Sequence, residues 1–146
     1  MNSSRTISLV KQTKNNNCAA ACISMVTGES IEEVEMELQA DGGKAPYGLD
    51  HIVRYFTRHG IYMEKIHSGL QTPILDDSIY IATCPSYTVA GESHMICLAV
   101  NHGSVQVLDP SDNLEEEKIF SLGVPVEGWI QCFEYFKLYD CTIKNS

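Results

Sequence analysis

The chain has 146 residues, of which 44% are hydrophobic, and a formal charge of −9 from 10 Lys and Arg against 19 Asp and Glu. This length and composition predict a single domain over residues 1–146 and exclude an intrinsically disordered chain. The few, scattered basic residues exclude a nucleic-acid-binding surface and a polybasic membrane patch, and no apolar run is long enough to form a membrane span.

The first residues lack the apolar stretch of a signal peptide. We therefore expect a cytoplasmic protein, or one exported as an effector without a conventional signal peptide. In a reducing compartment most cysteines are small, buried, unpaired side chains. That is the expectation for most of the six cysteines, which are Cys18, Cys22, Cys84, Cys97, Cys132 and Cys141.

The first half of the chain predicts three helices. Residues 18–28 are rich in alanine and end at Gly28, which favours a helix C-terminus. A second helix is expected over residues 30–40, because its first four residues, Ser-Ile-Glu-Glu, are typical of a capping box. Residues 48–60 have apolar side chains at i, i+3, i+4 and i+7 and a closing glycine, which predicts the third helix.

Two groups of polar side chains in this part of the chain and in later turns are expected to face solvent. One group is the acidic set of the second helix, Glu32, Glu33, Glu35 and Glu37. The other group comprises histidines on helix faces or in turns, His51, His59, His67 and His102.

The second half of the chain predicts strands. The candidate segments are 61–67, 78–83, 94–100, 104–108 and 129–139. The third and fourth are joined by Asn-His-Gly, which is typical of a hairpin turn. Helices followed by an antiparallel sheet predict an α+β fold.

Cys18 has a position that favours thiol chemistry. It follows the polar residues 14–17 and opens the first predicted helix. The N-terminus of a helix carries partial positive charge and free N–H groups, and both favour a thiolate. A buried structural cysteine in an alanine-rich helix is the alternative. Cys22 could complete half of a zinc site with Cys18, but the paired Cys-x2-Cys spacing of structural zinc sites is absent, so we expect Cys22 in the core and no metal.

His94 opens the third predicted strand, and Asp109 ends the fourth. Because these two positions are almost symmetric about the hairpin turn, we expect them to be neighbours at one end of the hairpin. A carboxylate placed there would orient the imidazole and leave its other nitrogen for a thiol. Gln12 precedes Cys18 in an extended segment and could supply an oxyanion donor beside the Cys18 backbone N–H.

The pattern Gln12-x5-Cys18, the histidine that opens an apolar strand, and Val107-Leu108-Asp109-Pro110 together resemble the papain-like cysteine peptidases. They are most similar to the bacteriocin-processing branch, which cuts leader peptides after a double glycine and usually has Asp-Cys-Gly where this chain has Asn17-Cys18-Ala19. The resemblance spans about residues 10–140 and implies a papain-like fold, with a helical half packed on an antiparallel sheet. It also implies the roles of four residues: Cys18 as nucleophile, His94 as base, Asp109 as orienting group and Gln12 as oxyanion donor.

We therefore expect a cysteine-dependent amide hydrolase: a thiol peptidase with a Cys-His-Asp triad that acts on a peptide or protein and needs no metal or organic cofactor. A glutamine or asparagine deamidase acting on a protein partner would use the same three groups. A binding module would keep the fold without the chemistry, and it ranks last because Cys18, His94 and Asp109 are all present. The sequence predicts neither the cleavage specificity nor the oligomeric state.

Overall fold

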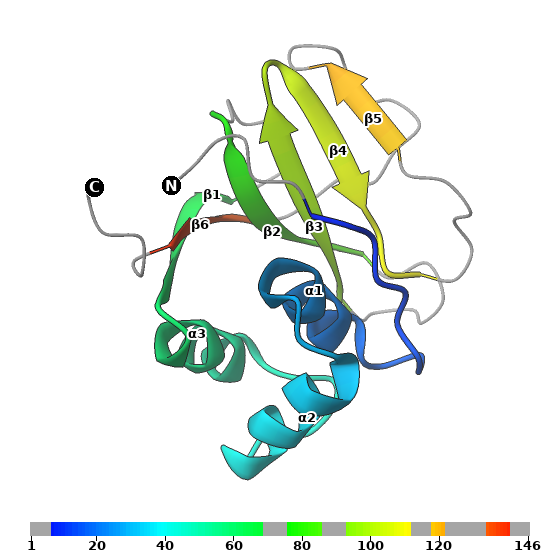
Figure 1. The fold of residues 1–146 in the computed structure, drawn as a ribbon, viewed down its shortest axis with the longest axis vertical. Helices are drawn as coiled ribbons and strands as arrows, with labels where there is room; N and C mark the ends of the chain where they lie inside the picture. Colours follow the sequence, from blue (N-terminus) through cyan, green and yellow to red (C-terminus); the bar gives the residue numbers. More distant parts are fainter. Residues whose placement is uncertain (1–6, 69–75, 86–92, 112–117, 122–133, 141–146) are drawn as a thin grey trace.

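The computed structural model describes residues 7–68, 76–85, 93–111, 118–121 and 134–140. Within these ranges three helices precede six strands, which confirms the α+β class (Figure 1). The helices are α1 (Cys18–Thr27), α2 (Ile31–Ala40) and α3 (Leu49–Arg58). None of the helices in the described part of the chain is long and apolar enough to cross a membrane.

The strands form one antiparallel sheet in the order β1-β6-β2-β3-β4-β5. Their bounds are β1 (Ile61–Ser68), β2 (Ser78–Pro85), β3 (Ser93–Asn101), β4 (Ser104–Leu108), β5 (Lys118–Ser121) and β6 (Glu134–Asp140). The short strand β5 was not expected from the sequence. The strand expected over residues 129–139 is confirmed as β6, and its residues 129–133 lie outside the described residues.

Local signals in the sequence set the ends of the first two helices. Gly28 has a φ of 82°, and its N–H donates to the Ser24 carbonyl, which ends α1. The Ser30 hydroxyl accepts a hydrogen bond from the Glu33 N–H at 3.1 Å, which begins α2. The helix boundaries predicted from these two caps are confirmed.

The core beside the site is formed by α1 and the centre of the sheet. Small and apolar side chains of α1 pack against alternate residues of β3, among them Met95 and Cys97. The intervening residues of β3, such as Ile96 and Leu98, belong to a second cluster. Because the strand is buried on both faces, it gives the residues at its ends a rigid support.

Two of the cysteines lie in this core as expected. Cys22 and Cys97 are fully buried and unpaired, and the Cys22 thiol donates to the Met95 carbonyl oxygen at 3.4 Å. Cys132 and Cys141 lie outside the described residues, and the side chain of Cys84 is not described.

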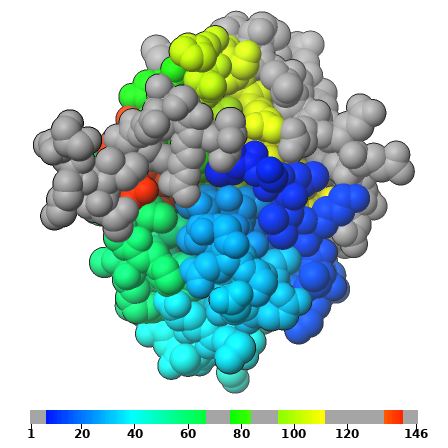
Figure 2. Space-filling view, in the orientation of Figure 1, coloured from blue at the N-terminus to red at the C-terminus, as the bar shows by residue number. Residues whose placement is uncertain are grey.

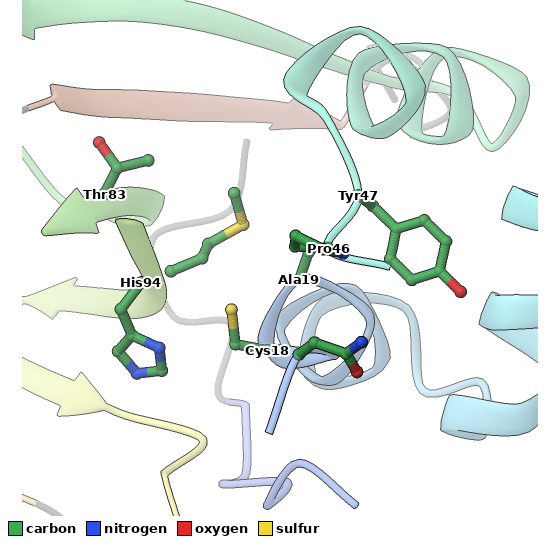
Figure 3. A pocket seen from close by; sticks show the side chains of 8 residues that line it. Cys18, Ala19, Pro46, Tyr47, Thr83 and His94 are labelled. Carbon is green, nitrogen blue, oxygen red and sulfur yellow. The ribbon is translucent and has the colours of Figure 1, made fainter. Parts of the chain in front are cut away.

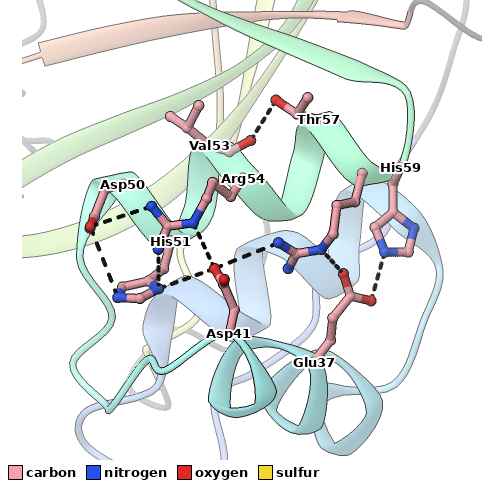
Figure 4. Close-up of polar contacts among 9 residues, drawn as sticks. Glu37, Asp41, Asp50, His51, Val53, Arg54, Thr57 and His59 are labelled. Atoms are coloured by element: carbon pink, nitrogen blue, oxygen red, sulfur yellow. Dashed lines mark hydrogen bonds and ion pairs between the residues drawn. The ribbon is translucent and has the colours of Figure 1, made fainter.

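A network of ion pairs joins the C-terminal part of α2 and its capping residue to α3 along its length (Figure 4). Glu37 accepts from Arg58 at 2.8 Å and lies 2.8 Å from His59. Asp41 accepts from Arg54 at 2.8 Å and lies 3.3 Å from His51. We call this group the α2–α3 network.

The expectation that these polar side chains face solvent was wrong for several of them. His51, His59 and Glu37 are half-buried and have partners, because α2 and α3 pack side by side. Glu35 is half-buried as well, because α2 also lies against Asn17 and Tyr47, which both donate to its carboxylate. The expectation is confirmed for Glu32, Glu33 and His102, which are exposed, while the side chain of His67 is not described.

Candidate functional site

Cys18 is the first residue of α1 and is half-buried. Asn17 before it is completely buried, but its side chain does not cap the helix. Instead, its Oδ1 accepts from the Lys14 N–H at 3.0 Å and its Nδ2 donates to Thr13 Oγ1 at 2.8 Å. The Asn17 side chain therefore does not cap the first N–H groups of α1, and the positive end of the helix lies beside the Cys18 sulfur.

The hairpin of β3 and β4 brings His94 and Asp109 to one end of the sheet. Asn101 pairs with Ser104 across a two-residue turn in which both residues, His102 and Gly103, have positive φ. This register opposes position 97 to position 108, so Asp109 follows β4 beside the first residues of β3. His94 Nε2 lies 2.6 Å from Asp109 Oδ1.

Both members of this pair are shielded from solvent. The exposed fraction of the side chain is 12% for His94 and 4% for Asp109. Asp109 Oδ1 also accepts from the Ser111 N–H at 2.9 Å, so the carboxylate is held from two directions. With Nε2 engaged by Asp109, the other ring nitrogen, Nδ1, is left for the Cys18 thiol, which faces the imidazole in Figure 3.

The surroundings of His94 favour its charged form. Burial by itself lowers the pKa of His94, but hydrogen bonds and charge interactions with Asp109 and Cys18 outweigh burial and raise it to about 9. The imidazole is therefore positively charged at neutral pH and lies beside a thiol. The surroundings of Cys22 favour its neutral form, because burial raises the pKa of its thiol and keeps it protonated.

Cys18 and His94 line a pocket of about 280 Å³ (Figure 3). Its other lining residues are Asn16, Ala19, Pro46, Tyr47, Thr83 and Met95. They come from the segment before α1, the start of α1, the segment before α3, and strands β2 and β3. Figure 3 shows Pro46 and Tyr47 on the α3 side, across from His94. A ligand in this pocket would contact the sulfur directly.

The Pro46–Tyr47 wall of this pocket was not expected from the sequence. The only signal was a proline next to an aromatic residue just before the third helix. Tyr47 is buried, and its position results from the packing of α2 against the segment before α3. That packing leaves no periodic pattern in the sequence.

The structure does not bring Gln12 into the group of residues that line the pocket, as far as the described residues go. Its Nε2 donates to the Lys14 carbonyl oxygen at 2.7 Å, and its backbone N–H donates to the Pro110 carbonyl oxygen at 2.8 Å. The second bond ties the segment before Cys18 to the residue after Asp109. The oxyanion role of Gln12 stays a prediction.

The pocket brings a thiol and an imidazole together. In the described part of the chain, no three His, Cys, Asp or Glu side chains are arranged to hold a metal ion. A thiol, a charged imidazole and an uncapped helix N-terminus are the groups that thiol-dependent acyl transfer needs.

The sequence of this chain matches no protein family and no curated protein. Its structure does resemble solved structures. One is a double glycine motif protease from an AMS/PCAT transporter in complex with the leader peptide, with a TM-score of 0.59, 14% identity, and coverage of 90% of this chain and 91% of that chain. Another is the peptidase domain of Streptococcus ComA, a bi-functional ABC transporter involved in a quorum sensing pathway, with a TM-score of 0.61, 14% identity, and coverage of 90% and 95%.

At 14% identity these likenesses establish the fold. The chain has an α+β papain-like fold, with a helical N-terminal half and an antiparallel sheet, as the resemblance in its sequence implied. The likeness to a double glycine motif protease and to the peptidase domain of an ABC transporter is confirmed at this level.

Proposed function

We propose that this protein is a cysteine-dependent peptidase that cleaves a peptide bond in a peptide or protein substrate. The observation that carries the proposal is the convergence of the Cys18 thiol, the charged His94 and the buried Asp109 beside an open pocket. Its likeness to peptidase domains, one of them in complex with a leader peptide, supports a peptide as substrate.

In the acylation step the Cys18 thiolate attacks the carbonyl carbon of the substrate. A carbon–sulfur bond forms, and the carbonyl electron pair moves to the oxygen. The resulting oxyanion is stabilised by the N–H groups at the start of α1. Gln12 Nε2, which donates to the Lys14 carbonyl in this structure, is the candidate second donor once it turns toward the substrate. The carbon–nitrogen bond then breaks as the His94 imidazolium gives its proton to the leaving amine.

In the deacylation step water attacks the acyl-thioester. Neutral His94 takes a proton from this water, and the Cys18 thiolate leaves as the carboxylic acid product forms. Asp109 fixes the ring orientation through Nε2 and stabilises the imidazolium that exists before attack and after deacylation.

Incubation with a proteome-derived peptide mixture tests the proposal, and synthetic peptides that contain Gly-Gly should be included. New termini identified by mass spectrometry should appear with the native protein and be absent with Cys18→Ser. The serine variant keeps the size and shape of the site but lacks a thiolate. Cleavage by both proteins at equal rates, or by neither, would contradict the proposed peptidase.

The same experiment distinguishes a deamidase, which would act on a side-chain amide with the same three groups. A mass gain of about one dalton on a Gln or Asn without any new terminus would identify that activity. That result would keep the proposed roles of Cys18 and His94 and change the proposed substrate from a peptide bond to a side-chain amide.

A further inference from the structure

Glu35 lies on α2 and does not line the pocket, but its carboxylate contacts residues on two sides of it. One carboxylate oxygen, Oε1, accepts from Asn17 Nδ2 at 3.3 Å. The other, Oε2, accepts from the Tyr47 hydroxyl at 2.6 Å. One half-buried carboxylate thus joins the residue before Cys18 to the residue that forms the opposite wall.

On the Cys18 side, Asn17 is a brace for the whole preceding segment. Its side chain is completely buried and bonds to Thr13, Lys14 and Glu35. Its carbonyl oxygen accepts from the Ala21 N–H at 3.1 Å, in the first turn of α1. A shift of Asn17 would therefore move Cys18 and the N–H groups beside it. In the space-filling view this segment lies on the surface between the helices and the sheet (Figure 2).

On the other side, Tyr47 is fixed by two hydrogen bonds of opposite direction. Its hydroxyl donates to Glu35 and accepts from Gln39 Nε2 at 3.1 Å. Burial, and then the adjacent Glu35 carboxylate, raise the pKa of Tyr47, so the hydroxyl keeps its proton and remains a donor. Both contacts come from α2, so this helix sets the position of the Pro46–Tyr47 wall.

We propose that Glu35 is a positioning residue for the hydrolase proposed above, because its carboxylate couples the segment that carries Cys18 to the Pro46–Tyr47 wall of the pocket. In the described part of the chain Glu35 forms no ion pair, so two neutral donors share its charge. The inference rests on the proposed function of Cys18. If it holds, Glu35 on α2, which does not line the pocket, sets both the width of the pocket and the position of the Cys18 thiol.

Exchanging the amide of Asn17 with the carboxylate of Glu35 tests whether their contact positions Cys18 and the wall. Asn17→Asp alone places two carboxylates face to face, which is repulsive. Glu35→Gln alone can accept from only one of its two partners and turns a donor toward the other. In the double variant N17D/E35Q, the amide at position 35 can donate to the carboxylate at position 17 and still accept from Tyr47. The net charge and the number of atoms of each kind stay the same.

Alkylation of Cys18 gives a readout that needs no knowledge of the substrate. Iodoacetamide reports the thiolate, and N-phenyl iodoacetamide carries the same reactive group with a ring that must fit against the Pro46–Tyr47 wall. Rates at pH 6 are followed by peptide mass spectrometry. The ratio of the two rates reports how well the phenyl ring fits against the Pro46–Tyr47 wall. A uniform loss of folded protein would lower both rates and leave this ratio unchanged.

We expect Asn17→Asp to slow iodoacetamide at Cys18 by about tenfold, because small displacements of a reacting group carry large rate penalties. Tyr47→Phe should chiefly reduce the preference for the phenyl reagent. Glu35→Gln should produce both defects, and N17D/E35Q should recover both to within about twofold of the native protein. Glu32→Gln removes the same charge from an exposed position of the same helix and should change neither rate.

The inference is overturned if Glu35→Gln leaves both rates unchanged, or if the double variant is as slow as Asn17→Asp. Where a single variant is less stable, recovery of folding in the double variant without recovery of the Cys18 rate also overturns it. Failure of the proposed function looks different: Cys18 of the native protein would then react no faster than Cys18 in His94→Ala, whatever is done to Glu35.

Discussion

Histidine meets carboxylate in two regions of this molecule with almost the same geometry. In the pocket, His94 lies 2.6 Å from Asp109, and in the α2–α3 network, His59 lies 2.8 Å from Glu37 (Figure 4). The difference is in the remaining partners. Glu37 also binds Arg58, whereas the described partners of Asp109 are His94 and the backbone N–H of Ser111.

This difference gives the two histidine–carboxylate pairs different electrostatic surroundings. In the network an arginine already balances the carboxylate, and both groups are about one-third exposed to water. In the pocket, the imidazolium is the cation that faces both Asp109 and Cys18, and solvent is largely excluded. Among the described residues, the pocket pair is more deeply buried than the network pair, lies beside a thiol, and has no arginine bound to its carboxylate.

Removing one imidazole from each region should have the largest effect. His94→Ala should slow alkylation of Cys18 by iodoacetamide at pH 6 by about 100-fold, because the sulfur loses the adjacent cation that favours its thiolate. His59→Ala is the matched control and should leave the rate unchanged. The rate is measured at each cysteine by peptide mass spectrometry. Equal rates in the native protein and in His94→Ala would refute the catalytic role of the pocket pair.

The pH dependence of stability provides a second test. The pKa of His94 is raised from 6.5 to about 9 in the folded protein, so its contribution is fully present below pH 6.5 and is lost as the pH rises through about 9. We expect the free energy of unfolding, measured with urea, to fall by about 2 kcal/mol over this range.

His94→Gln is the control for this effect, since it keeps a polar side chain but cannot gain a proton. Its stability should be nearly flat between pH 6.5 and 9. A native protein whose stability does not fall on the alkaline side would show that the charged imidazole is not favoured by folding.

Asp109→Asn separates the charge of the carboxylate from its hydrogen bond, because the asparagine oxygen can still accept from His94 Nε2. Without the anion the pKa of His94 falls from about 9. In the native protein the rate of Cys18 alkylation should stay nearly constant up to about that pH, and in Asp109→Asn this range of constant rate should end at a lower pH. We also expect a drop of about tenfold in the rate at pH 6. An unchanged pH profile would mean that Asp109 acts only in packing.

Much of the fold was predictable because its signals are local. The Ser30 side chain and the positive φ of Gly28 set helix ends that differ by at most one residue from those expected. Strand β5 was missed because its four residues are too few to show a clear alternation. The hairpin turn fixes a register, and the register in turn places Asp109 beside His94.

The rest of the site depends on packing between elements that are distant in the sequence. The contact of Glu35 with Asn17 and Tyr47 forms only when α2 lies against both flanking segments. In the sequence, Glu35 is one of several acidic residues on a helix and is indistinguishable from exposed Glu32. Burial of a polar side chain is a tertiary property, which is why the half-buried carboxylates and histidines of α2 and α3 were expected in solvent.

The smallest predicted effect concerns the network itself. Burial by itself raises the pKa of Glu37, but hydrogen bonds from His59 and Arg58 outweigh it and lower the pKa below the ordinary 4.5. The contribution of Glu37 is therefore present above that pH and is lost as the pH falls, the opposite side from His94. Because the pair is partly exposed, Glu37→Gln should cost only about 0.5 kcal/mol in urea unfolding at pH 7, with no change in the Cys18 rate. A loss of Cys18 reactivity in Glu37→Gln would show that the two regions are coupled, and the contrast between a reactive pair and a structural pair would then no longer hold.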